Sequence, residues 1–308
     1  YNSCKNPNCP ECGSVDKEIW IHKQERFTLN VNYFHVVFTI PNELNVLCLI
    51  DPKFMYKVLF DISAETIKEL SKDKKYLGAK IGFTSVLHTW GQNLSLHPHI
   101  HMIVPGGGID SNGKWKNSKK KFFLPVKVVS KLFKGKFLSY TKKNFDQRKI
   151  KDKEQFQEII NSCYSKDWVV YTKKPMKSAK HVVKYLGRYT HRIAISNARL
   201  KKYEDNKVTF SYKDYSDHNQ IKEMTLDDTE FFRRYMMHVL PSNFMKIRHY
   251  GFLGNRNKEE RIKAIRTATN TKDPGSFLID YEQIISDILK RDVSICIKCG
   301  QKRHHKLE

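Results

Sequence analysis

Residues 97–104 read His-Pro-His-Ile-His-Met-Ile-Val, and a glycine turn follows at 106–108. Apolar residues alternate with His99 and His101, a spacing typical of a β-strand, in which successive side chains point to opposite faces of a sheet. The two histidines would therefore share one face, while the apolar residues beside them point into the opposite layer. Two imidazoles on one face of a strand can bind one metal ion.

A second strand is expected immediately before this one, over residues 80–89, with a polar loop at 91–98 joining the two. A third metal ligand would come from the exit of that strand. Gln92 is the favoured candidate and His88 is the alternative. His35 could approach from a neighbouring strand, but a buried histidine is more often a hydrogen-bonded core residue, and we expect that role for it.

The rest of the chain mixes helical and strand patterns, which predicts an α+β fold with a central antiparallel sheet flanked by helices. The expected strands are 34–40, which stops at Pro41, and 122–128, 168–172 and 208–212. The expected helices are 54–72, 178–189 and 229–240, with a helical insertion near 136–166. The expected domains are an N-terminal element at 1–27, a core at 28–255 and a helical tail at 256–308.

The segment Tyr185-Leu186-Gly187-Arg188-Tyr189 places two phenols four residues apart. On a helix this spacing brings both onto one face, with their Cβ atoms about 5 to 6 Å apart. Packing against a sheet is the common role of such a pair, but cations that suit a phosphodiester flank this one: Lys184, Arg188, His191 and Arg192. A phenol with a pKa near ~10 needs a metal-activated phosphorus to act as a nucleophile at neutral pH.

The charge of the chain predicts a polyanionic partner. Lys and Arg number 56 against 32 acidic residues, for a net charge of +24. Nucleic acid is the expected partner, because basic surfaces gain affinity by displacing the counterions of phosphates, although a solvated basic surface would look the same. Trp90, Tyr250 and Phe252 could stack on bases. No apolar run is long enough to predict a membrane-spanning helix.

Cysteines gather at the two ends of the chain. Cys4, Cys9 and Cys12 crowd the N-terminus, and Cys296 and Cys299 lie near the C-terminus, followed by His304 and His305. Spacings of this kind indicate zinc in a reducing cytosol, so we expect a cytoplasmic protein. Three N-terminal thiolates are one short of a closed tetrahedral site, and the chain begins with Tyr1, so we expect further ligands upstream. Cys48 and Cys163 are expected to be ordinary buried residues.

Taken together, these segments resemble the two-tyrosine transposases of insertion-sequence family 91, members of the HUH (His-hydrophobe-His) nucleases that act by a rolling-circle route. The resemblance covers most of the chain and runs through residues 4–12, 33–41, 87–92, 97–99, 185–192 and 247–253. It implies that His99 and His101 hold Mg²⁺ or Mn²⁺, and that Tyr185 or Tyr189 forms a 5′-phosphotyrosine with single-stranded DNA of transposon ends and target. It also implies an N-terminal zinc-binding element and a bacterial or archaeal, nucleoid-associated protein.

Two other functions fit the same residues. A rolling-circle replication initiator or a relaxase would use the same chemistry on a different DNA. A zinc-dependent DNA-binding protein without catalysis belongs to another class, and the joint presence of both histidines and both tyrosines argues against it.

Overall fold

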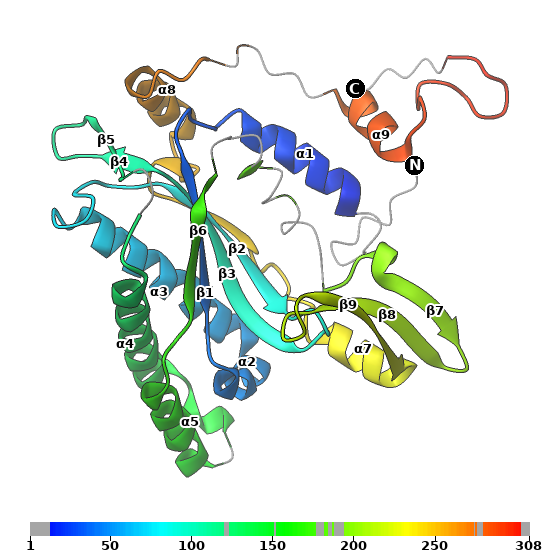
Figure 1. Ribbon diagram of the computed structural model, residues 1–308, viewed down its shortest axis with the longest axis horizontal. Helices are drawn as coiled ribbons and strands as arrows, with labels where there is room; N and C mark the ends of the chain where they lie inside the picture. The colour runs from blue at the N-terminus through cyan, green and yellow to red at the C-terminus, as the bar shows by residue number, and fades with distance from the viewer. Residues whose placement is uncertain are drawn as a thin grey trace.

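The computed structural model describes residues 13–119, 123–150, 152–176, 182–183, 187, 194–273, 275 and 280–302. At its centre lies a five-stranded sheet in which every neighbouring pair is antiparallel (Figure 1). Its strand order is β10 (Ile247–Tyr250), β2 (Phe83–Trp90), β3 (Leu96–Pro105), β1 (Tyr33–Thr39) and β6 (Val170–Met176). The predicted α+β fold with a central antiparallel sheet is therefore confirmed.

The strand that carries the histidine pair is the middle strand of this sheet. On one side of β3, His101 lies opposite Val37 of β1, and on the other side it lies opposite Val86 of β2. Because side chains alternate along each strand, His99 and His101 share one face, and Ile100 and Met102 point into the opposite layer, as expected. Both apolar side chains are fully buried.

Four helices cover the face to which Ile100 and Met102 point (Figure 1). They are α2 (Asn45–Ile50), α3 (Pro52–Lys72), α4 (Val126–Asn144) and α5 (Lys153–Ser165), and the short helix η1 (Asn42–Leu44) leads into α2. Asp51 starts α3 by accepting a hydrogen bond from the backbone N–H of Phe54, and Pro52 occupies the first turn, where no N–H is needed. The predicted helix over 54–72 is confirmed.

One expected strand is wrong. Residues 126–128 begin helix α4, and Phe123 and Leu124 are buried in the turn that precedes it. The β-branched run suggested a strand, but the spacing of Val129, Phe133 and Phe137 is helical, and their burial against the sheet decides the conformation. The segment 136–166 is helical as expected, comprising the end of α4, η2 (Gln147–Lys149) and α5, and its buried residues belong to the main core.

The opposite face of the sheet carries α1 (Gly13–Glu25), with α8 (Lys258–Ala268) beyond β10 and η4 (Gly251–Leu253). Helix α9 (Tyr281–Leu289) packs against α1. A small hairpin of β4 (Gly107–Ile109) and β5 (Trp115–Asn117) follows β3. Among the described helices, none has the length and apolar character needed to span a membrane.

A three-stranded meander lies beside one end of the sheet (Figure 1). It consists of η3 (Asn197–Arg199), β7 (Leu200–Glu204), β8 (Lys207–Asp214) and β9 (Gln220–Asp227), followed by α7 (Asp228–Met236). Phe210 and Phe231 form the centre of its own apolar cluster, which also takes in Leu94 from the loop between β2 and β3. The meander is thereby anchored to the loop that precedes the histidine strand.

Candidate metal centre and its surroundings

Three histidines converge on one face of the sheet. The ligand nitrogens of His88, His99 and His101 all lie within 4.8 Å of one another. The antiparallel register brings them together, because His88 of β2 lies directly opposite His99 of β3. His88, the alternative third ligand in the sequence, thus joins the pair. Atoms at this spacing can face a common ion.

The hydrogen bonds of the triad fix which ring nitrogens are available. The Nδ1–H of His99 donates to the backbone carbonyl of His97 at 2.6 Å, which leaves Nε2 of His99 as the lone-pair donor. Nδ1 of His101 lies 2.8 Å from Nε2 of His35, and the two rings are stacked. Nε2 of His101 is then the nitrogen available to an ion. His35 is 3% exposed, so its predicted role as a hydrogen-bonded core histidine is confirmed.

His99 and His101 are held in the neutral state. Burial lowers the pKa of His99 to about 4 and that of His101 well below its usual value, and the neighbouring histidines push in the same direction. Neutral imidazoles are the form that binds metals. No Asp or Glu is among the described residues that line the surrounding cavity, so these residues offer an ion imidazoles and neutral oxygens but no carboxylate.

The triad opens into a cavity of about 520 Å³. One wall comes from the meander: Tyr215, in the turn between β8 and β9, and Arg199. The amide of Gln92 donates to the hydroxyl of Tyr215 at 3.4 Å. Arg199 donates to the backbone carbonyls of Gln92 and Ser211 and so joins the meander to the loop after β2. Gln92, favoured in the sequence as the third ligand, lines the same cavity as the triad.

The three aromatic residues expected to stack on bases have different surroundings. Trp90 lines the cavity and stacks on His88 with ring centroids 4.4 Å apart, so it lies beside the triad. Phe252 is 7% exposed and packs on Trp115, while Tyr250 stacks on Phe83. Base stacking by Phe252 and Tyr250 was the wrong expectation, because their rings are occupied by the protein itself.

The predicted nucleophiles and their cationic neighbours lie outside the described residues: Tyr185, Tyr189, Lys184, Arg188, His191 and Arg192. Within their segment, Val182, Val183 and Gly187 are described and helical. Val182 is 1% exposed and packs with Val86 and Ile103 on the histidine face. Val86 is two residues before His88, and Ile103 is two residues after His101. Val182 therefore packs next to the triad, at the neighbouring same-face position of each strand.

Gly187 makes a close approach to α1. A Cβ atom at this position would lie 2.3 Å from Cδ1 of Ile21, a separation that real side chains do not adopt. Ile21 is itself buried. The absence of a side chain at residue 187 therefore sets how closely the backbone at this position can approach α1.

The C-terminal cysteines lie in a tight turn. The N–H of Gly300 donates to the carbonyl of Cys296, the N–H of Cys296 donates to the carbonyl of Gln301, and Gly300 has a φ of +71°. This turn brings Cys296 and Cys299 together with both side chains at least partly exposed. The N-terminal Cys4, Cys9 and Cys12 lie outside the described residues. Cys48 and Cys163 are buried, as expected.

Sequence reasoning missed Arg199 and Tyr215. Both are about a hundred residues from the histidine strand, and neither stands in a pattern that marks it. Their position beside the triad depends on the packing of the meander against Leu94, a contact that the linear sequence does not reveal.

The chain is similar in sequence to known transposases. A family model described as "Putative transposase" matches residues 82–261, and one described as "Transposase zinc-binding domain" matches residues 1–40. The chain is 39% identical over 319 residues to "Putative transposase y4qJ" of Sinorhizobium fredii, covering 98% of this chain and 79% of that protein. It is 28% identical over 307 residues to "Transposase for insertion sequence element IS801" of Pseudomonas savastanoi pv. phaseolicola, covering 98% of this chain and 74% of that protein. No solved structure matches.

Proposed function

The chain belongs to the transposases of insertion-sequence family 91, and from this premise we propose that it cuts and rejoins single-stranded DNA through a tyrosine nucleophile beside a histidine-bound metal ion. Its substrate would be the DNA of its own element and target. The observation that carries the proposal is the triad of His88, His99 and His101, whose ligand atoms lie within 4.8 Å of one another.

We propose His88, not Gln92, as the third protein ligand. The ring of His88 is directly beside those of His99 and His101, with centroids 5.3 and 4.4 Å away. Gln92 lines the cavity on the side of Tyr215, to whose hydroxyl its amide nitrogen donates. Three neutral imidazoles fit a divalent transition metal better than Mg²⁺, which prefers oxygen ligands, so Mn²⁺ is the better candidate. When bound, such an ion polarises a phosphate and favours attack at phosphorus.

The reaction conserves the phosphodiester energy. The phenolic oxygen of Tyr185 or Tyr189 bonds to the scissile phosphorus, and the bond from phosphorus to the 3′ oxygen breaks. The phenol gives up its proton, and the leaving 3′ oxygen gains one. The products are a 5′-phosphotyrosine and a free 3′-hydroxyl, and attack by another 3′-hydroxyl on the phosphotyrosine reseals a strand without ATP.

The location of the tyrosine segment supports this role. Val182 packs beside Val86 and Ile103, so the described part of the segment runs over the histidine face. Cationic residues next to the tyrosines, among them Lys184 and Arg188, suit a DNA backbone that lies across this face. Trp90, beside His88, is proposed to contact a nucleotide next to the cut.

Covalent capture tests the proposal. The purified protein is incubated with single-stranded oligonucleotides from the element ends and Mn²⁺, and the product is separated under denaturing conditions. A protein–DNA adduct is expected from the wild type, with less from Tyr185→Phe or Tyr189→Phe and none from the double variant. An adduct of undiminished yield in the double variant would refute a tyrosine nucleophile, and no adduct from the folded wild type would refute the nuclease.

A further inference from the structure

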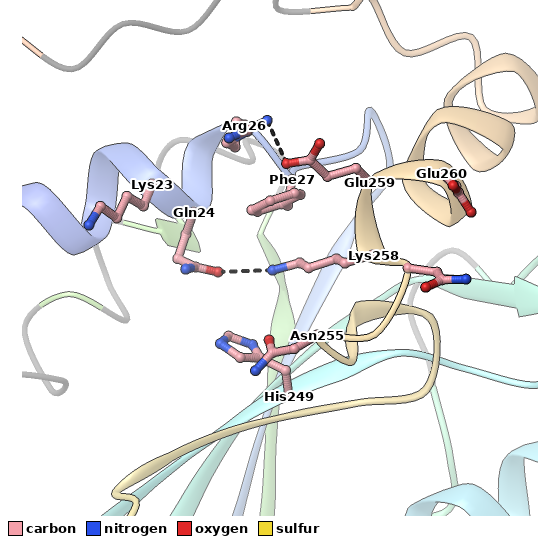
Figure 2. A pocket seen from close by; sticks show the side chains of 10 residues that line it. Lys23, Gln24, Arg26, Phe27, His249, Asn255, Lys258, Glu259 and Glu260 are labelled. Carbon is pink, nitrogen blue, oxygen red and sulfur yellow. Dashed lines mark hydrogen bonds and ion pairs between the residues drawn. The ribbon is translucent and has the colours of Figure 1, made fainter.

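A second cavity, of about 650 Å³, lies between α1, β10 and α8 (Figure 2). Its lining is rich in cations and amides: Lys23, Gln24, Arg26, His249, Asn255 and Lys258. Figure 2 shows Lys258 extended from the start of α8 towards Gln24 on α1, with the ring of Phe27 on one side and His249 and Asn255 on the other. The cavity is separate from the one at the histidine triad, with which it shares no described lining residue.

Lys258 is the unusual residue of this cavity. Its exposed fraction is only 8%, which is rare for a lysine. Its ammonium lies 3.6 Å from the centre of the Phe27 ring and 3.5 Å from the amide oxygen of Gln24. Among the described residues, no carboxylate forms an ion pair with it.

A buried ammonium without a carboxylate partner is costly, because an aromatic ring and one amide replace little of the water it loses. Burial lowers the pKa of Lys258 to about 8, and the charge of Arg26 contributes in the same direction. An anion that entered the cavity would offset this cost. Two other groups favour an anion there: the N–H groups of the first turn of α8 and the side chain of Lys23 on the rim.

The two acidic residues on the rim do not occupy this position. Glu259 is paired with Arg26 at 2.8 Å. Figure 2 shows Glu260 pointing away from the ammonium of Lys258. The polar groups in the interior of the cavity are therefore the ammonium of Lys258, the imidazole of His249 and the neighbouring amides.

We propose that this cavity binds a phosphate of the DNA backbone, with Lys258 as its buried cation; this assignment rests on the proposed function of the chain. The site lies on the histidine face of the sheet, because His249 is opposite Thr84 and is hydrogen-bonded to it. Thr84 precedes His88 by four residues, about 13 Å along the strand at ~3.3 Å per residue. Helix α1, which forms the other wall, belongs to the segment matched by the zinc-binding model.

Binding measurements test the site without reference to catalysis. A labelled single-stranded oligonucleotide of about 30 nucleotides, longer than the ~4–16 that one binding site covers, is titrated with Lys258→Gln, Lys258→Arg and the exposed control Lys153→Gln. Lys153 lies on α5, behind the opposite face of the sheet. We expect Lys258→Gln to bind about fivefold more weakly in ~0.1 M salt and to lower the slope of log K against log salt by about 0.7, the value for one phosphate on a single strand. Lys258→Arg keeps the charge and stays near the wild type.

Affinity and slope unchanged in folded Lys258→Gln would overturn the proposal, as would an equal loss in the Lys153 control. Competitive acetylation of the wild-type lysines, read by mass spectrometry, covers the case in which Lys258→Gln does not fold. The oligonucleotide should slow acetylation of Lys258 severalfold and leave Lys153 unchanged. No protection refutes the site, and equal protection by inorganic phosphate alone would assign it to a small free anion.

Covalent capture separates this proposal from the proposed function. At DNA concentrations below the dissociation constant, Lys258→Gln should form less phosphotyrosine adduct in proportion to its weaker binding, and Lys153→Gln should match the wild type. A wild type that binds DNA through Lys258 but forms no adduct would refute the nuclease and leave the phosphate site in place.

Discussion

At the scale of the residue, the candidate metal centre depends on His35, a histidine outside the triad that is hydrogen-bonded to His101. His35 holds Nδ1 of His101 at 2.8 Å and so orients the ring that faces the triad. Partners of this kind fix the tautomer and direction of a metal-binding imidazole, and their removal typically costs 10- to 100-fold in metal affinity, as an order of magnitude. His35 is therefore a positioning residue.

Replacing His35 tests this role. His35→Phe should weaken Mn²⁺ binding by roughly 10- to 100-fold, because the ring of His101 loses its hydrogen-bond partner, whereas His35→Gln retains an acceptor and should recover much of the affinity. Calorimetric titration with Mn²⁺ measures both. His218→Asn, on an exposed turn with positive φ that Asn tolerates, is the matched control. Equal affinity in all four proteins would show that the contact has no part in metal binding.

The donor set also predicts a metal preference. Because no described carboxylate lines the cavity, Mn²⁺ should support adduct formation at a concentration at least about tenfold below that of Mg²⁺. The measurement is the adduct yield as each ion is added back to chelator-treated protein. Half-saturation by Mg²⁺ at the lower concentration would show that oxygen donors complete the site.

At the scale of the element, two described residues near the predicted tyrosines make close contacts with α1 and with the sheet. Gly187 approaches Ile21 of α1, and Val182 packs on the strands next to the triad. These contacts join α1, which follows the N-terminal cysteines, to residues on either side of the predicted nucleophile Tyr185. A substitution that alters one of these contacts should therefore also alter the other.

A double-mutant cycle measures this contact. Gly187→Ala places a methyl group against the buried Ile21 side chain and should destabilise the protein by about 1–3 kcal/mol, the usual cost of overpacking. Combining it with Ile21→Ala removes the clash, so the two changes should be coupled by about 0.5–3 kcal/mol. Chemical denaturation gives the four free energies of unfolding. Purely additive values would mean that residues 187 and 21 do not meet.

Elements with a clear period could be predicted from the sequence, and the details of the site could not. The alternation in residues 97–104 was enough to place His99 and His101 on one face, because the period of a strand is local. The choice between His88 and Gln92 depended on the register of β2 against β3, which is a contact between strands. The strand predicted over residues 122–128 was wrong because a β-branched run is also compatible with a helix when burial requires it.

At the scale of the whole molecule, α9 packs against α1, so the tail that carries Cys296 and Cys299 lies near the segment that follows the N-terminal cysteines. The turn at Gly300 holds the two C-terminal cysteines in one loop. Two thiolates do not close a tetrahedral site, and further ligands are required.

Zinc content tests the C-terminal pair. The double variant Cys296→Ser, Cys299→Ser should lose about one zinc ion per chain, because a structural site does not survive the loss of two thiolates. Elemental analysis of protein purified without chelators measures this, with Cys48→Ala as a control that changes a buried thiol. Zinc content equal to the wild type would show that the C-terminal cysteines bind no zinc.

The meander of β7, β8 and β9 keeps its own apolar centre around Phe210 and Phe231, and it meets the sheet through Leu94 and Arg199. One wall of the triad cavity thus belongs to a module whose apolar cluster contains none of the three imidazoles. Changes in the length or charge of the turn at Tyr215 would alter the shape of the cavity entrance and leave the positions of the three histidines on the sheet unchanged.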